Sequence, residues 1–406
     1  MVTNDNIQGE VIFLNNRLSR IDYGQIFLLF ILACIGLLAI HSAETSSELA
    51  TNAFLKQVVF YAVGIVMVLI IMRFNAAQLM KLAWFLYGIG LSSLVFLIVA
   101  PESIARTING AKNWFHIPGL GTLQPSEFMK IFLIVMLAML IHKHHQKYTE
   151  RTVRLDLFLL AKIILVTLLP LALIVKEDLG TALVILAIAT GITFVSGISW
   201  RLLIPIALVV LCAVGGIFYL VLKEPQILEK ELGVKRYQLD RIYSWQDPYQ
   251  SEDTTGYQLV CSLNAVGSGE VVGKGFSNRN VYLPEAHTDF IFSVIGEEYG
   301  FIGASFVIML FLLLLYTWVQ TGLETRIPFN VYLCTGVISM TMYHVFQNVG
   351  MAIGLVPITG IPLPFISSGG SSLWASMIAV GLIFGIRYHH NMVEYQEERV
   401  HDDGKL

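Results

Sequence analysis

Ten long runs of apolar residues, separated by polar segments, extend through this chain of 406 residues. The hydrocarbon core of a bilayer is about 30 Å thick and is crossed by roughly 20 helical residues, close to the length of most of these runs. The runs are continuous and do not alternate, so they predict membrane-spanning helices and not barrel strands. The predicted spans are residues 23–42, 55–72, 83–100, 128–142, 157–175, 181–197, 203–222, 296–319, 329–350 and 372–387.

The composition excludes a soluble protein of this size. Hydrophobic residues make up 55% of the chain and charged residues 14%, whereas about 25% of the residues in soluble proteins are charged. We therefore predict an all-α polytopic membrane protein with ten transmembrane helices. A net charge of −3 excludes a basic nucleic-acid binder. The four cysteines show neither a disulfide framework nor metal-ligand spacing.

The distribution of basic residues predicts the orientation in the membrane. With the N-terminus inside, the inner segments hold thirteen Lys and Arg residues, and the short outer loops with their edges hold four. Both termini are therefore expected in the cytoplasm. We expect a cytoplasmic segment at residues 1–22 with no cleavable signal peptide, a membrane domain at 23–387 and a cytoplasmic tail at 388–406. A large outer loop, residues 223–289, is expected between the seventh and eighth spans.

Three outer segments are polar enough to carry chemistry, namely residues 101–127, 223–289 and 351–371. Because the inner loops are short, a site is expected where these three segments meet. The glycine-rich stretch from Gly267 to Gly275 fits neither the dinucleotide fingerprint nor the P-loop, so no nucleotide or organic cofactor is expected. No internal repeat is evident, which weakens the prediction of an inverted-repeat transporter.

The segment from Leu283 to Phe292 places an acid, Asp289, directly before an apolar run. A carboxylate at a membrane surface is partly desolvated, which raises its pKa toward neutrality and suits a general base. A structural alternative is that Thr288 or Asp289 caps the helix that follows. The spacing by itself leaves both interpretations open.

Other charged residues have similar pairs of interpretations. Lys130 lies three residues after Glu127 on one helix face, which favours a local ion pair over an anion-binding role. Asp178 precedes a span and is expected to cap it. Arg236 and Arg241, in the long outer loop, have the chemistry to grip a pyrophosphate, although a solvated loop carries such charges anyway.

Several motifs occur together in one order and make the chain resemble the SEDS family (shape, elongation, division and sporulation) over about residues 20–388. Within that family it resembles the RodA branch more than the FtsW branch, on Thr359-Gly360-Ile361-Pro362. The motifs are Asn109-Gly110-Ala111 with Trp114, Gln124 to Lys130, Asp178 to Ala182, Gly256-Tyr257-Gln258, Ala265 to Gly269, Leu283 to Phe292 and Pro357 to Pro364.

The resemblance implies a peptidoglycan glycosyltransferase that polymerises lipid II and releases undecaprenyl pyrophosphate. It places the active site at the outer face of the cytoplasmic membrane of a bacterium, and it makes the acid of the His-Thr-Asp-Phe motif, here Asp289, the proposed base. The expected partners are a class B penicillin-binding protein, lipid II with the nascent glycan chain, and membrane lipid. A divalent cation, Mg²⁺ or Mn²⁺, is a further expectation, with its ligands unassigned.

The candidate substrate-binding residues for the pyrophosphate or the sugars are Arg106, Lys112, Glu127, Lys130, Asp178, Arg236, Arg241, His287, Ser367 and Ser371. Lys112 stands one position earlier than the basic residue of many relatives, and Ser368 replaces their usual tyrosine. Alternative functions are a lipid II flippase or other transporter, a scaffold for a penicillin-binding protein without chemistry of its own, and the division or sporulation paralogue.

Overall fold

The structure is a computed structural model that describes residues 22–45, 52–105, 107, 111–117, 121–148, 150, 152–223, 236–249 and 254–403. Its elements include one short hairpin and twelve helices in the described residues. The helices are α2 (Tyr23–Thr45), α3 (Ala53–Ile71), α4 (Ala76–Val99), α5 (Pro125–Lys147), α6 (Val153–Ile174), α7 (Leu179–Val195), α8 (Trp200–Lys223), α10 (Arg236–Gln246), α11 (Thr254–Ser268), α12 (Ile291–Glu324), α13 (Pro328–Ala352) and α14 (Gly370–Asp403). The hairpin pairs β1 (Phe115–Ile117) with β2 (Gly121–Leu123) in antiparallel register.

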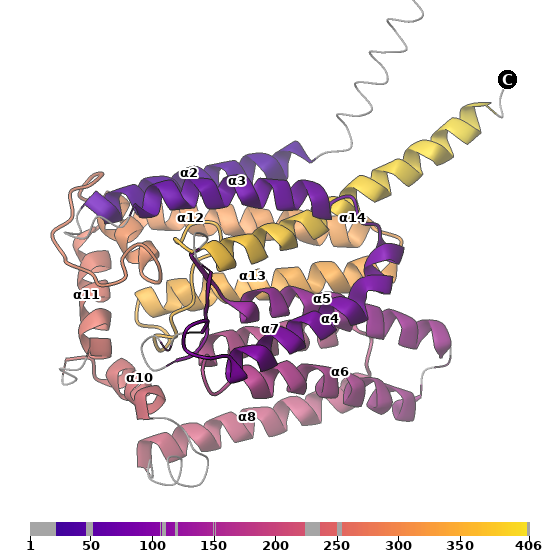
Figure 1. The fold of residues 1–406 in the computed structure, drawn as a ribbon, viewed down its shortest axis with the longest axis horizontal. Coiled ribbons are helices and arrows are strands. Elements are labelled where there is room, and N and C mark those ends of the chain that lie inside the picture. Colours follow the sequence, from indigo (N-terminus) through magenta and orange to yellow (C-terminus); the bar gives the residue numbers. More distant parts are fainter. Residues whose placement is uncertain are drawn as a thin grey trace, which may run out of the picture.

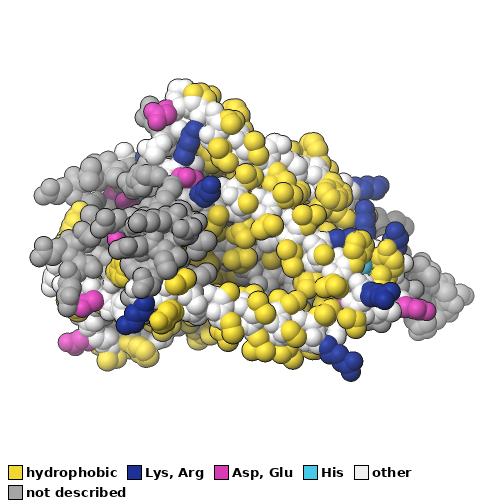
Figure 2. Space-filling model, turned by 90° about the horizontal axis from the view of Figure 1, so that it is seen from below, with side chains coloured by type: hydrophobic (Ala, Val, Ile, Leu, Met, Phe, Trp, Pro, Cys, Tyr) yellow, Lys and Arg dark blue, Asp and Glu magenta, His cyan; other side chains and the backbone are white. Residues whose placement is uncertain are grey.

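The long helices lie side by side, and α10 and α11 cross one end of the bundle (Figure 1). Helix α5 is central, with 83% of the residues in its most apolar stretch buried, and α13 packs against α5, α7 and α12. Helix α8 lies at the edge, and only 6% of the residues in its most apolar stretch are buried. A broad zone of hydrophobic side chains separates the charged ends in Figure 2, as expected for a protein solvated by lipid.

Eight helices of the described residues are long and apolar enough to cross a membrane, and each matches a predicted span. The other two predicted spans, residues 181–197 and 329–350, are also helical, as α7 and α13. Helix α7 has only 17 residues, and α13 carries polar side chains such as His344, Gln347 and Asn348. The chain is therefore a multi-pass membrane protein, and the count of ten spans stays a prediction.

Helix α4 begins at Ala76, earlier than the predicted start at residue 83, because Asn75 caps it. The Asn75 side chain accepts a hydrogen bond from the backbone N–H of Gln78, and the Gln78 side chain accepts one from the backbone of Asn75. Such a capping box satisfies backbone groups that a helix end leaves free. A window that counts only apolar residues misses this turn.

Two segments that were predicted to lie outside the membrane contain helix. The segment 223–289, expected as an outer loop, contains α10 and α11. These two helices are too polar to be predicted as membrane spans. The predicted boundary at residue 387 falls inside α14, which continues to Asp403. The residues that follow the apolar part of α14 include Glu and Arg, which favour the helix as strongly as leucine does.

The segment before α12 is anchored to a kink in that helix. Gly300 has φ 61° and breaks the regular backbone, and the chain around Lys274 packs against the break. The backbone N–H of Lys274 donates to the Glu297 carbonyl at 3.0 Å, and its ammonium lies 2.6 Å from the Glu297 carboxylate. The Arg279 guanidinium lies 3.5 Å from the carboxylate of Glu298. These contacts fix the approach to the segment that carries Asp289.

Candidate active site

A cavity of about 840 Å³ lies at the end of the bundle. Its lining includes Trp114 from the first polar segment, Asp289 from the second and Thr359 from the third. The three segments therefore meet as the sequence predicted. The lining is acidic, because Arg241 is its one basic residue within the described part of the chain. Its five acids are Glu127, Glu177, Asp178, Glu285 and Asp289.

Asp289 presents its carboxylate to this cavity and does not cap the next helix. Helix α12 begins after Phe290, with no side-chain cap, so the capping interpretation is wrong for both Thr288 and Asp289. The Thr288 hydroxyl lies 2.9 Å from the Glu285 carboxylate instead. Among the described residues, none forms a hydrogen bond or an ion pair with the Asp289 carboxylate. Its backbone carbonyl accepts a hydrogen bond from Asn348 at 2.7 Å.

The surroundings of Asp289 raise its pKa to about 7, and loss of water is the largest cause. The side chain keeps partial access to solvent through the cavity, but protein surrounds it on its other sides. The negative charges of Glu285 and Asp178 also raise this pKa, and the positive charge of Arg241 lowers it. Asp289 therefore exchanges a proton near neutral pH, as a general base must.

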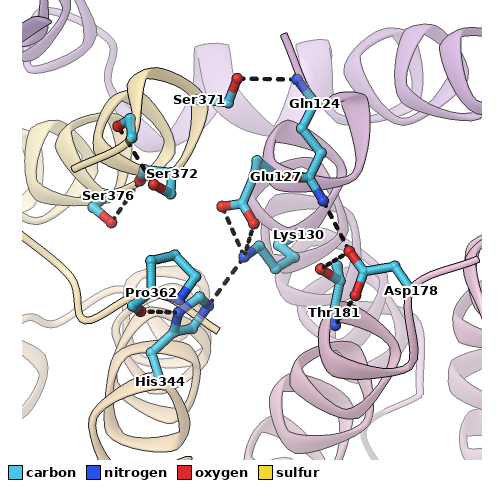
Figure 3. Close-up of polar contacts among 11 residues, drawn as sticks. Gln124, Glu127, Lys130, Asp178, Thr181, His344, Pro362, Ser371, Ser372 and Ser376 are labelled. Carbon is cyan, nitrogen blue, oxygen red and sulfur yellow. Dashed lines mark hydrogen bonds and ion pairs between the residues drawn. The ribbon is translucent and has the colours of Figure 1, made fainter. Parts of the chain in front are cut away.

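Asp178 caps α7 as predicted and also lines the cavity (Figure 3). Its Oδ1 accepts the backbone N–H of Thr181 at 2.8 Å. Its Oδ2 accepts the Thr181 hydroxyl at 2.7 Å and the Gln124 side-chain amide at 2.8 Å. These bonds connect the start of α7 to the start of α5, so two walls of the cavity are held together.

Glu127 and Lys130 form the predicted ion pair. The Lys130 ammonium lies 2.9 Å from each carboxylate oxygen of Glu127, and both side chains are buried. The same ammonium lies 3.0 Å from Nε2 of His344 (Figure 3). Glu127 lines the cavity whereas Lys130 does not, so the geometry favours the pair over direct anion binding by Lys130.

The candidate residues of the third segment hold the loops together. The Ser371 hydroxyl lines the cavity and accepts the backbone N–H of Gln124 at 2.9 Å. The Ser367 hydroxyl donates to the carbonyl of Thr288 at 2.7 Å and does not line the cavity. The carbonyl of His287 accepts the backbone N–H of the residue after Ser367 at 2.9 Å. Ser367 and His287 therefore position the segment that carries the catalytic candidate.

The other four Lys and Arg candidates are placed differently from one another. Arg241 lines the cavity and donates to the carbonyl of Thr359 at 3.1 Å. The Lys112 ammonium binds carbonyls at the end of α4, including that of Ile98 at 3.2 Å, where a cation is favoured by the helix dipole. Arg106 lies outside the described residues, and so does the side chain of Arg236, the first residue of α10.

Sequence reasoning missed Glu285, Gln258, His344 and Asn348 as site residues. Glu285 and Gln258 line the cavity, and Asn348 donates both to Asp289 and to the carbonyl of Ile361 at 2.8 Å. One signal was present in the sequence. His344 and Asn348 are polar residues inside an apolar span, and such residues usually face the interior of a bundle.

The described residues do not fit a metal ion held by the protein alone. Within this part of the chain no three His, Cys, Asp or Glu side chains lie together as metal ligands. The expected Mg²⁺ or Mn²⁺ therefore stays a prediction.

A protein-family model described as "Cell cycle protein" matches residues 24–392. The chain is 31% identical over 407 residues to the probable peptidoglycan glycosyltransferase FtsW of Lactococcus lactis, with 95% of each chain covered. It is 30% identical over 434 residues to the peptidoglycan glycosyltransferase RodA of Treponema pallidum, with 91% of this chain and 98% of the relative covered.

Two solved structures are similar over most of their length. One is a chain from work on the structural coordination of polymerization and crosslinking by a peptidoglycan synthase complex. It has a TM-score of 0.72 and 28% identity, and the match covers 91% of this chain and 98% of that one. The other is the crystal structure of the rod shape determining protein RodA of Thermus thermophilus. It has a TM-score of 0.64 and 26% identity, with 90% and 96% covered.

Proposed function

The chain belongs to the SEDS family of peptidoglycan glycosyltransferases, and we propose that Asp289 is the general base with which it polymerises lipid II. One observation carries this proposal. The Asp289 carboxylate faces the 840 Å³ cavity without a hydrogen-bond partner among the described residues, and its pKa is raised to about 7. A base whose pKa lies near the working pH combines the correct protonation state with strong basicity.

The proposed reaction is a direct displacement at the anomeric carbon of the donor lipid II. The acceptor sugar hydroxyl, the 4-OH of GlcNAc, transfers its proton to Asp289 as its oxygen attacks that carbon. The bond from the anomeric carbon to the pyrophosphate breaks at the same time, and undecaprenyl pyrophosphate leaves with the electron pair. A positioned base contributes about 10²–10⁴ in rate, and orientation of the two substrates contributes much of the rest.

Arg241 is the basic residue best placed for the departing pyrophosphate. It lies in the cavity lining, and its guanidinium matches phosphate oxygens in a bidentate way. Its positive charge also lowers the pKa of Asp289, against the effects of burial and Glu285. Arg241 therefore has two roles in this proposal, since it neutralises the leaving group and limits the protonation of the base.

The experiment is polymerisation of labelled lipid II by the purified chain in complex with a class B penicillin-binding protein. We expect Asp289→Asn to lose glycan polymer while its expression and thermal unfolding stay like those of the wild type. Lys112→Met is the control, because the Lys112 ammonium binds carbonyls at the end of α4 and Lys112 is not a lining residue, and it is expected to keep its polymer. Undiminished polymer from Asp289→Asn would disprove the assignment. A flippase would need no such base, so retained lipid II transport without polymerisation would favour that alternative.

The proposed setting is the bacterial cytoplasmic membrane, with the cavity at its outer face and a class B penicillin-binding protein as partner. The basic inner segments support this orientation, and the similarity to a chain of a peptidoglycan synthase complex supports the partner. We expect turnover to rise when the transmembrane helix and stalk of the partner bind. Equal turnover with and without the partner would contradict this expectation.

Within the family we propose a role in elongation and cell shape. The support for this role is the Thr359-Gly360-Ile361-Pro362 motif. Overall identity does not distinguish the two roles, because the relatives named RodA and FtsW match at nearly equal identity. Complementation tests this role. We expect the chain to restore growth to cells depleted of their own RodA and not to cells depleted of FtsW. Rescue of the FtsW-depleted cells alone would assign the chain to division.

A further inference from the structure

The Lys130 ammonium has three acceptors and is fully enclosed. It has three N–H donors and no acceptor of its own. Two of the contacts are the Glu127 carboxylate oxygens at 2.9 Å, and the third is Nε2 of His344 at 3.0 Å (Figure 3). A buried ammonium that loses an acceptor is strongly disfavoured, because no water replaces the lost bond. His344 therefore completes the environment of Lys130.

These contacts define the protonation state of His344. Because Lys130 only donates, Nε2 of His344 has to accept, and the ring proton lies on Nδ1. Nδ1 lies 3.3 Å from the carbonyl oxygen of Pro362, which accepts that proton's hydrogen bond. His344 is thus a neutral bridge from the ion pair on α5 to the loop that follows α13.

The bridged loop forms part of the wall around Asp289. Pro362 lines the cavity, and so does Gly360, where an added Cβ would lie only 3.1 Å from Oδ2 of Asp289. One helical turn after His344, the Asn348 amide donates to the carbonyls of both Asp289 and Ile361, at 2.7 and 2.8 Å. One face of α13 therefore connects this loop to Asp289 through Asn348 and to the Glu127 pair through His344.

We propose that His344 is a positioning residue for glycosyl transfer, which holds the Glu127 carboxylate and the Asp289 wall of the cavity in register. The proposal rests on the proposed function of Asp289. His344 does not line the cavity, so it acts through Lys130 and Pro362 and leaves substrate contacts in place. Its loss should therefore lower kcat and leave KM for lipid II within about twofold, since misplacement by about 1 Å slows an enzyme by up to 10²-fold.

The test compares His344→Leu with His344→Gln in the complex that the chain forms with its penicillin-binding protein. Leucine offers no acceptor to Lys130, so kcat is expected to fall by about tenfold or more. The oxygen of glutamine reaches the position of Nε2 and should restore most of the rate. Thr341→Val is the matched control, because Thr341 is a buried polar residue on the same helix, and its turnover is expected to be unchanged. Should His344→Leu fail to accumulate, His344→Asn replaces it, because its shorter amide ends before Lys130.

A double-mutant cycle separates this role from a general loss of stability. If His344 acts through Lys130, adding His344→Leu to Lys130→Met should lower kcat little further than Lys130→Met alone. Additive losses, or kcat of His344→Leu equal to that of the wild type, would overturn the positioning role. Loss of polymer in Asp289→Asn would still support the proposed function in that case, whereas a wild-type complex without polymer would overturn the function itself.

Discussion

At the scale of single residues, the acids around Asp289 control when it accepts a proton. Glu285 lies four residues before it, lines the same cavity and has φ 54°, in the left-handed region. Its negative charge raises the pKa of Asp289, second only to burial. Burial and, after it, this neighbouring carboxylate thus keep the proposed base partly protonated at neutral pH.

Glu285→Gln should make the enzyme more active under acidic conditions. Removing the charge lowers the pKa of Asp289, so the base is ionised at lower pH. We expect kcat below about pH 7 to rise a few-fold relative to the wild type, and to change little above it. At a pH well below the pKa, lowering the pKa by one unit raises the ionised fraction of the base about tenfold. Parallel pH–rate profiles measure this, with the exposed Glu102→Gln as the control. A shift of the variant's profile to higher pH would contradict the prediction.

The sequence predicted those site residues whose contacts are local or lie in a recognised motif. Glu127 pairs with Lys130 three residues away, and Asp178 caps the helix that follows it, so spacing sufficed for both. His344 and Asn348 escaped prediction because their partners lie on other elements. The spacing of a single sequence carries no information about which faces of two helices meet.

At the scale of elements, the kink of α12 depends on glycine. A Cβ at Gly300 would lie 2.5 Å from the backbone nitrogen of Gly273, and φ of 61° strains any other residue. No flexible side chain is available to yield, since the atoms in the way belong to the backbone. The kink therefore requires glycine to let the segment before Asp289 pack on α12.

Gly300→Ala should destabilise the chain by about 1–3 kcal/mol or more, from backbone strain and the clash. The measurement is thermal unfolding in detergent, together with proteolysis of the segment around Lys274. Gly267→Ala is the control, because a Cβ at Gly267 meets nothing within 4 Å. Alanine favours the helix interior, so this control should be neutral or slightly stabilising. Equal thermal unfolding temperatures of Gly300→Ala and Gly267→Ala would contradict the role of Gly300.

Most helices were predictable from hydropathy, and the exceptions have physical causes. The start of α4 depends on a polar capping box, and α14 continues past the membrane in polar helix formers. Helices α10 and α11 are not spans at all, so a search for apolar runs overlooked them. Only their packing on the rest of the chain, such as the Trp245 indole donating to the Gly354 carbonyl at 2.8 Å, reveals their place.

At the scale of the whole molecule, the orientation decides which compartment the cavity faces. Val272 is 75% exposed in the connection between α11 and α12, which also carries Asp289, and Lys143 is exposed near the end of α5 that lies away from the cavity. In a chain whose native cysteines are replaced, Val272→Cys should react with a membrane-impermeant maleimide added to intact cells. Lys143→Cys should react only after the membrane is opened. The reverse pattern would place the cavity in the cytoplasm and refute the proposed orientation.

The most direct test of Asp289 as the base is the pH dependence of kcat/KM for lipid II, measured with the partner complex from about pH 5 to pH 9. The base has to be ionised, and its pKa is about 7. We therefore predict that kcat/KM falls about tenfold per pH unit below that value and levels off above it. Any residual activity of Asp289→Asn should lack this transition. A wild-type profile that is flat across the range, or a transition that persists in Asp289→Asn, would show that Asp289 is not the base.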